Sequence, residues 1–107
     1  MTGCCQVTTT LPDKAAAELV AATLVAERLA ACAQVLGPVW STYVWKNQTE
    51  QAQEWYCHLK TTVPRFPDLQ RRIRELHPYE LPEIIALPIL EGDEAYLQWI
   101  RDEVGVT

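Results

Sequence analysis

The apolar positions of this chain recur with a helical period in two separate stretches. In the first, positions 17, 20, 21 and 24 are apolar, which is the i, i+3, i+4, i+7 spacing of a helix with one buried stripe. Pro12 and Asp13 are expected to lie in the first turn of this helix, which is expected to end near residue 30 or 31. The second helix is expected to begin at Val63-Pro64 and to end at His77-Pro78.

Four other stretches are rich in β-branched and aromatic residues, or are short and apolar, and predict strands. They are residues 6–10, 33–45, 50–62 and 84–90. The two middle strands form a long hairpin, which breaks or bends at Gly37-Pro38. The last stretch is expected to be buried, and its Pro88 indicates a sheet edge, a bulge or the end of the strand. A short C-terminal helix carries Tyr96 and Trp99 or Ile100.

The resulting element order, β-α-β-β-α-β followed by a further helix, is that of an α+β protein. It predicts the ferredoxin-like split βαβ arrangement, in which helices cover one face of a four-stranded antiparallel sheet. The chain has 107 residues and neither an internal repeat nor a linker, so residues 1–107 are expected to form one domain.

The predicted hairpin is too long for a compact subunit of this size. Its strands of about 13 residues span roughly 40 Å, whereas a compact chain of this length is about 30–35 Å across. The hairpin also carries five large aromatic residues, Trp40, Tyr43, Trp45, Trp55 and Tyr56. Because exposed aromatic strands favour aggregation, we expect a second copy of the chain to cover them.

The segment from Glu75 to Leu90 is the main candidate for ligand chemistry. Its three prolines exclude a continuous helix and predict a rigid loop ahead of the last strand. This loop gathers an imidazole, a phenol and carboxylates beside a strand, a typical location for binding residues. These residues are His77, Tyr79, Glu80 and Glu83.

Composition excludes several classes of function. The net charge of −5 argues against nucleic-acid binding, and the apolar stretches are shorter than the roughly 20 residues that cross a membrane. With no leader-like N-terminus and four cysteines outside any C-x-x-C motif, the chain is expected to be cytoplasmic, with its cysteines buried. The sequence contains no nucleophile, phosphate-loop or zinc-protease motif, so we expect no enzyme.

Blocks distributed over nearly the whole chain resemble the CutA divalent-cation tolerance proteins. They are Thr10-Leu-Pro-Asp13, Glu27-Arg-Leu-Ala-Ala-Cys32, Ser41-Thr-Tyr-Val-Trp-Lys46, Lys60-Thr61 and His77-Pro-Tyr-Glu-Leu-Pro-Glu-Ile84. The resemblance implies a PII-like homotrimer of ferredoxin-like subunits, with a cytoplasmic role in tolerance to divalent metals and copper as the usual candidate ligand. Thr9 departs from the pattern, because some relatives carry a cysteine there.

Two residues are candidate metal ligands. His77 offers an imidazole that suits copper or zinc, but a histidine at a helix C-terminus also pairs with exposed carbonyls. Cys32 offers a soft sulfur donor, and buried packing is the alternative role for a cysteine at this position.

A further set, Trp45, Lys60, Tyr79 and Glu83, is expected to line a cleft between subunits. In a second hypothesis the chain is a PII-like sensor, whose cleft takes a small molecule and signals to an unknown protein partner. In a third the cleft residues only stabilise the assembly, for example through an ion pair of Glu83 with Lys60 or Arg28.

Overall fold

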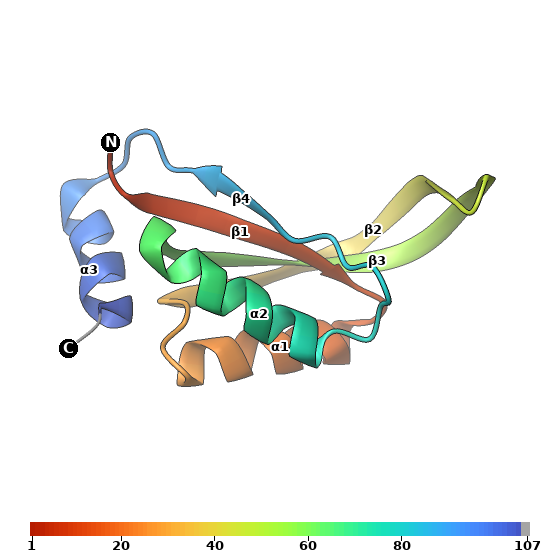
Figure 1. The fold of residues 1–107 in the computed structure, drawn as a ribbon, viewed down its shortest axis with the longest axis horizontal. Helices are drawn as coiled ribbons and strands as arrows, with labels where there is room; N and C mark the ends of the chain where they lie inside the picture. Colours follow the sequence, from red (N-terminus) through yellow and green to blue (C-terminus); the bar gives the residue numbers. More distant parts are fainter. Residues whose placement is uncertain (106–107) are drawn as a thin grey trace.

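The fold was obtained as a computed structural model, which describes residues 1–105. Its helices and strands follow one another in the order expected from the sequence (Figure 1). The strands are β1 (Cys4–Leu11), β2 (Cys32–Trp45), β3 (Gln48–Thr62) and β4 (Ile85–Pro88). The helices are α1 (Lys14–Ala26), α2 (Phe66–Leu76) and α3 (Glu94–Val104), and a 3₁₀ turn at Val63–Arg65 leads into α2.

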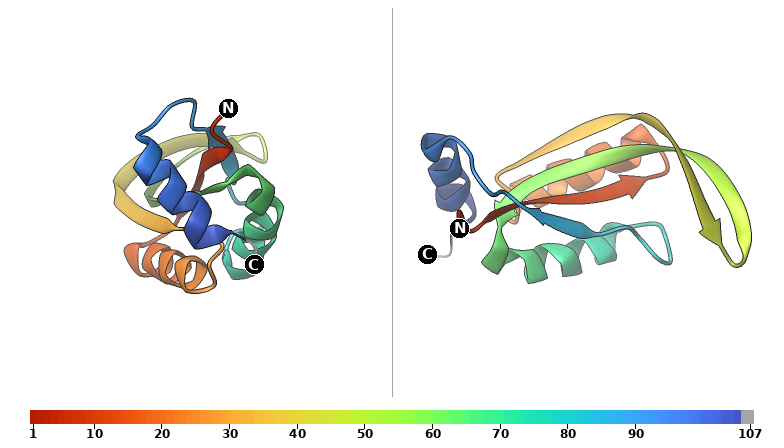
Figure 2. Two further views of the ribbon diagram at one scale, coloured as in Figure 1. Left: turned by 90° about the vertical axis from the view of Figure 1, so that its left-hand side faces the viewer. Right: turned by 90° about the horizontal axis from the view of Figure 1, so that it is seen from above.

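The four strands form one sheet in the order β2-β3-β1-β4, and every neighbouring pair is antiparallel. Helices α1 and α2 pack against each other on one face of this sheet (Figures 1 and 2). The predicted α+β ferredoxin-like fold with an antiparallel sheet and an extra C-terminal helix is therefore confirmed.

The main core lies between the sheet and these two helices. The apolar stripe predicted for α1 is buried at Ala17, Val20 and Leu24. Asp13 caps the start of the helix and does not lie in its first turn as expected, because its backbone is extended and its Oδ1 accepts the backbone N–H of Ala16 at 2.7 Å. This packing holds α1 against the centre of the sheet.

The long hairpin bends where the sequence predicts, and its turn is shorter than the expected residues 46–49, because β3 already begins at Gln48. Its two-residue turn places Lys46 and Asn47 at φ 50° and 67°, the left-handed backbone of the turn type that matches the strand twist. A β-bulge lies at Gly37-Pro38, where these two residues oppose Trp55 alone between the pairs Leu36–Tyr56 and Val39–Glu54. The bulge redirects the distal half of the hairpin, which curves away from the sheet in Figure 2.

Two further expectations from the sequence are wrong. Helix α1 ends at Ala26, four residues early, because Arg28 adopts φ 61° and the N–H of Leu29 bonds back to the carbonyl of Leu24. The last strand is at the sheet edge as expected, but all four residues of β4 are exposed, not buried. A short apolar run predicts a buried strand, but this one forms the outermost strand of the sheet, so its side chains are open.

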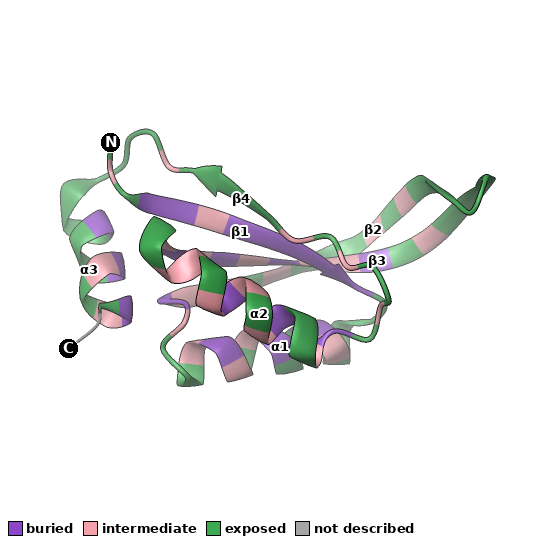
Figure 3. Cartoon of the chain, in the orientation of Figure 1, coloured by how far each residue is buried: buried purple, intermediate pink, exposed green. Residues whose placement is uncertain are grey.

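The hairpin extends beyond the body of the subunit, as predicted from its length. The molecule measures 44 × 25 × 22 Å, and the distal hairpin forms the far end of its long axis (Figures 1 and 3). Trp40 is 66% exposed there, and Tyr43 and Val44 are exposed beside it. An aromatic ribbon this open is typical of a surface that another molecule covers.

Helix α3 forms a second, smaller apolar cluster at the opposite end of the sheet. It buries Leu97, Ile100 and Val104 against Cys4, whereas Cys5 points into the main core, as expected for consecutive residues of a strand. All four cysteines are free. In residues 1–105 no helix is long and apolar enough to cross a bilayer.

Thr9 provides a test of the core, because its fully buried hydroxyl has no hydrogen-bond partner within residues 1–105. Replacing Thr9 by valine removes this unpaired group, so we expect the free energy of unfolding to rise by about 1 kcal/mol. Thr61→Val is the matched control, since Thr61 is equally buried but donates to the carbonyl of Leu29 at 2.8 Å. The control is expected to lose about 1 kcal/mol in urea unfolding, and a loss of stability in both variants would contradict the assignment.

Candidate functional site

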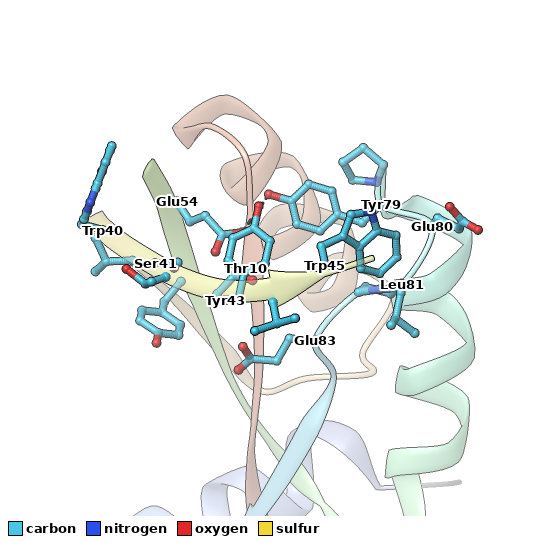
Figure 4. A pocket seen from close by; sticks show the side chains of 16 residues that line it. Thr10, Trp40, Ser41, Tyr43, Trp45, Glu54, Tyr79, Glu80, Leu81 and Glu83 are labelled. Atoms are coloured by element: carbon cyan, nitrogen blue, oxygen red, sulfur yellow. Dashed lines mark hydrogen bonds between the residues drawn. The ribbon is translucent and has the colours of Figure 1, made fainter. Parts of the chain in front are cut away.

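A wide groove lies between the distal half of β2 and the loop that follows α2. It encloses about 870 Å³ and is lined by residues 39–45 of the hairpin and 78–83 of the loop (Figure 4). The bulge at Gly37-Pro38 brings these segments together, because it turns the hairpin toward the loop. Both walls carry aromatic side chains, Tyr43 and Trp45 on one and Tyr79 on the other.

A buried carboxylate lies in this groove. Glu54 is only 7% exposed, and its Oε2 accepts a hydrogen bond from the Tyr79 hydroxyl at 2.7 Å. Burial and the neighbouring Glu54 raise the pKa of Tyr79 well above its usual range, so the phenol keeps its proton and remains a donor. Within residues 1–105 Glu54 forms no ion pair.

Glu80 and Glu83 add two further carboxyl groups to the same groove, and Glu83 is the one whose pKa responds to the charge of Glu54. Burial raises the pKa of Glu83, and the negative charge of Glu54 raises it further. Among the described residues that line the groove there is no lysine, arginine or histidine to offset these charges. A cation that enters the groove therefore relieves the repulsion between Glu54 and Glu83.

His77 is buried at the start of the loop and positions Tyr79. Its Nε2 donates to the carbonyl oxygen of Thr10 at 2.8 Å, and its Nδ1 accepts the backbone N–H of Tyr79 at 3.1 Å. Burial lowers the pKa of His77, although the Thr10 carbonyl and the charge of Glu54 oppose that shift, so the ring is neutral. Both nitrogens are thus occupied, and neither has a free lone pair for a metal in this arrangement.

Cys32 lies far from His77. It begins β2 opposite Lys60, where its Sγ is 3.5 Å from the hydroxyl of Tyr96 on α3. Lys60 in turn pairs with Gln6 on β1. Gln6 lies four residues, or about 13 Å along the strand, from Thr10, whose carbonyl accepts the hydrogen bond of His77. The two predicted metal ligands are therefore apart within a subunit, and residues 1–105 contain no cluster of three or more His, Cys, Asp or Glu suited to a metal.

The four residues predicted to line a cleft are only partly brought together. Trp45, Tyr79 and Glu83 all line the groove. Lys60 does not, because its ammonium donates to Oε1 of Gln34 at 2.8 Å near the other end of β3. Trp45 pairs with Gln48, twelve residues or about 40 Å along β3 from Lys60.

Sequence reasoning missed Glu54 and Tyr43. The sequence does contain an indication for Glu54. Strand alternation places it on the same face as Tyr56 and His58, and a carboxylate in the middle of a long strand is unusual. Tyr43 was expected only to support assembly. Its place in the groove depends on the direction of the hairpin beyond the bulge.

The fold and the groove define an α+β protein of the ferredoxin-like class with an acidic, aromatic groove beneath an overhanging hairpin. A sequence model of the family described as "CutA1 divalent ion tolerance protein" matches residues 5–103. The chain belongs to this family, and the predicted resemblance is confirmed.

Relatives agree over nearly the full length. The divalent-cation tolerance protein CutA of Thermus thermophilus is 44% identical over 96 residues, which cover 90% of this chain and 93% of the relative. The solved structure of Cut A1 from Thermus thermophilus matches with a TM-score of 0.93 at 42% identity, over 95% of this chain and 99% of that one.

A relative from Archaeoglobus fulgidus corrects one expectation. Its structure matches with a TM-score of 0.91 at 31% identity, over 94% of this chain and 98% of that one, and it is named a periplasmic divalent cation tolerance protein CutA. The prediction of a cytoplasmic location is therefore wrong on this comparison. It was drawn from cysteine usage and the N-terminal sequence, neither of which fixes a compartment in this family.

Proposed function

We propose that this chain acts in divalent-cation tolerance as a homotrimeric binding protein, not as an enzyme, and that it holds a divalent ion between Glu54 and Glu83. The observation that supports the site is the buried carboxylate of Glu54, which forms no ion pair among the described residues and shares its groove with Glu83, whose pKa the charge of Glu54 raises. Buried charges are normally paired or bound to a metal. The relatives are named for divalent-cation tolerance, which agrees with a cationic occupant.

The donor atoms favour ions that accept oxygen ligands. Glu54, Glu83 and the tyrosine hydroxyls of the groove offer only oxygen, which suits Mn²⁺ or Mg²⁺ better than Cu⁺. Cu²⁺ binding through His77, the ligand predicted from sequence, requires Nδ1 to release the backbone N–H of Tyr79. Cys32 takes part only if a neighbouring subunit brings its sulfur to a second site.

Isothermal titration of the purified protein with MnCl₂ and CuCl₂ tests the ion site. We expect Glu83→Gln to weaken Mn²⁺ binding by about tenfold or more, because one of the two carboxylates proposed to hold the ion is replaced by a neutral amide. Glu18→Gln is the control, since Glu18 is an exposed carboxylate on the outer side of α1. Equal affinity in both variants, or no uptake of either ion by the wild type, would contradict the proposed ion site.

The exposed apolar surface supports the trimer. Leu87 of β4 is 53% exposed and Ile85 nearly as open, and both lie on the edge strand opposite β2. Such a surface on a 12.1 kDa chain is expected to be covered by other copies. The relatives named above give no support to the alternative of a PII-like sensor.

Sedimentation equilibrium measures the assembly directly. We expect a particle of three chains at micromolar concentration, and dissociation in Leu87→Asp, because a carboxylate on that surface cannot be covered without a partner charge. Leu19→Asp, an exposed leucine on α1 away from the sheet, is expected to leave the assembly intact. A folded wild-type monomer of 12.1 kDa would refute the trimer.

A further inference from the structure

The size of the groove exceeds what a bare metal ion requires. A volume of about 870 Å³ falls within the range of small-molecule pockets, about 300–1,000 Å³. A metal ion between Glu54 and Glu83 would leave most of this space to water, beside side chains that are largely apolar. The groove therefore has room for an occupant with an apolar body.

The walls of the groove carry aromatic side chains, which are not ligands for a divalent metal ion. Tyr43 and Trp45 from the hairpin and Tyr79 from the loop present aromatic rings around the two carboxylates (Figure 4). Aromatic rings attract cations through their negative faces, most strongly in the case of tryptophan. The ammonium of Lys46 already lies 5.6 Å from the centre of the Trp45 ring without lining the groove, which is consistent with this attraction.

We infer that the groove also binds a small organic cation, an ammonium ion that carries an apolar body, with its charge on Glu54 and its body between the aromatic walls. Two independent observations carry this inference. Glu54 is more than nine-tenths buried and has no ion pair within residues 1–105, so the groove needs a positive charge. The aromatic rings on both walls then select a cation with an organic body over a bare ion.

This inference shares its carboxylates with the proposed metal site but depends on residues that the metal does not need. A divalent ion and an ammonium ion should therefore compete, and both should lose affinity in Glu54→Gln. Only the ammonium ion should respond to replacement of Trp45, because a metal takes no ligand from an indole ring. The failure of one proposal is thus distinguishable from the failure of the other.

Phenethylammonium chloride is a suitable probe, since it joins a phenyl ring to a primary ammonium group. Isothermal titration of the purified wild-type assembly should show binding that is at least about tenfold tighter than that of phenethyl alcohol, its neutral analogue. Ammonium chloride, which has the charge without the body, should bind weakly or not at all. This comparison needs no variant, so it holds even if Glu54→Gln fails to fold.

Two tryptophans of matched exposure provide the variant test. Trp45→Leu should weaken phenethylammonium by about threefold or more while leaving Mn²⁺ unchanged. Trp99→Leu should change neither, because Trp99 is 40% exposed, close to the 38% of Trp45, but lies on α3 outside the groove. Equal effects of the two substitutions on the amine would overturn the inference.

The remaining outcomes are also decisive. Equal affinity for the amine and the alcohol would show that charge is not recognised. No binding of the amine to the wild type, together with looser assembly of Glu54→Gln in sedimentation, would mean that a basic side chain of another copy fills the groove. Either result would overturn the inference.

Discussion

Replacing His77 by alanine is expected to lower the free energy of unfolding by about 2–4 kcal/mol. The substitution removes the ring that bonds both the Thr10 carbonyl and the Tyr79 N–H, and each buried group left unpaired costs about 1–3 kcal/mol. It also removes the ring that packs against Tyr79, with centroids 4.8 Å apart. Urea unfolding measures the loss.

The other histidine provides the control. His58 is half-buried, and a side-chain hydrogen bond joins its Nδ1 and the hydroxyl of Thr8 at 3.0 Å. His58→Ala is expected to lower the free energy of unfolding by about 1 kcal/mol. If His77→Ala left stability unchanged but abolished metal uptake, His77 would be a metal ligand, as the sequence predicts, and not the residue that positions Tyr79.

The pH dependence of stability gives a second measure of His77. Because burial lowers the pKa of His77 below 6.5, the unfolded chain takes up a proton first as the pH falls. The stabilisation that the neutral His77 provides is present above pH 6.5 and is lost as the pH falls through the lowered pKa of this residue. The free energy of unfolding should therefore depend less steeply on pH in His77→Ala than in the wild type. His58 adds to the same pH dependence and Glu83 opposes it, and both remain in the variant.

Replacing Gly37 by alanine is the second change with a large expected effect. A Cβ at this position would lie 2.6 Å from Cδ1 of Trp55, 2.8 Å from its Cγ and 3.1 Å from its Cα. The ring and backbone of Trp55 cannot both move away without disturbing the bulge, so we expect a loss of about 1–3 kcal/mol in urea unfolding. The substitution should also change the shape of the groove, because the bulge directs the distal hairpin toward the loop.

Gly92→Ala is the matched control for this prediction. The nearest atoms to a Cβ there would be Cδ2, Cγ and Cδ1 of Leu97, at 3.2, 3.4 and 3.5 Å, so a shift of a few tenths of an ångström in this side chain would accommodate it. We expect a change within about 0.5 kcal/mol and unaltered Mn²⁺ binding. Equal stability losses in the two variants would show that the contact between Gly37 and Trp55 does not hold the bend.

Local patterns were sufficient wherever a structural feature depends on neighbouring residues. Asp13 caps α1 and Asn47 forms the hairpin turn, because a cap and a two-residue turn are set by side chains and backbone within a few positions. The end of α1 was misjudged, since Arg28 adopts a left-handed backbone that its residue type does not indicate.

The candidate site was predictable only in part. The loop carrying Tyr79 and Glu83 was recognised, because its prolines exclude a helix and its polar residues are consecutive. Lys60 was wrongly grouped with Trp45, although strand length alone separates residues at opposite ends of a long hairpin strand. Glu54 was missed, because its burial depends on the hairpin and on the loop 25 residues further along.

The sequence by itself determined the order of the elements, the faces of α1 and α2 that pack against the sheet, the turn and the break in the long hairpin. These follow from periodicity and backbone preference, which act within one element. Only the tertiary structure decided that His77 has no free nitrogen, that β4 is open, and that Glu54 and Glu83 share a groove. Burial and charge pairing arise between segments far apart in the chain, so no local pattern contains them.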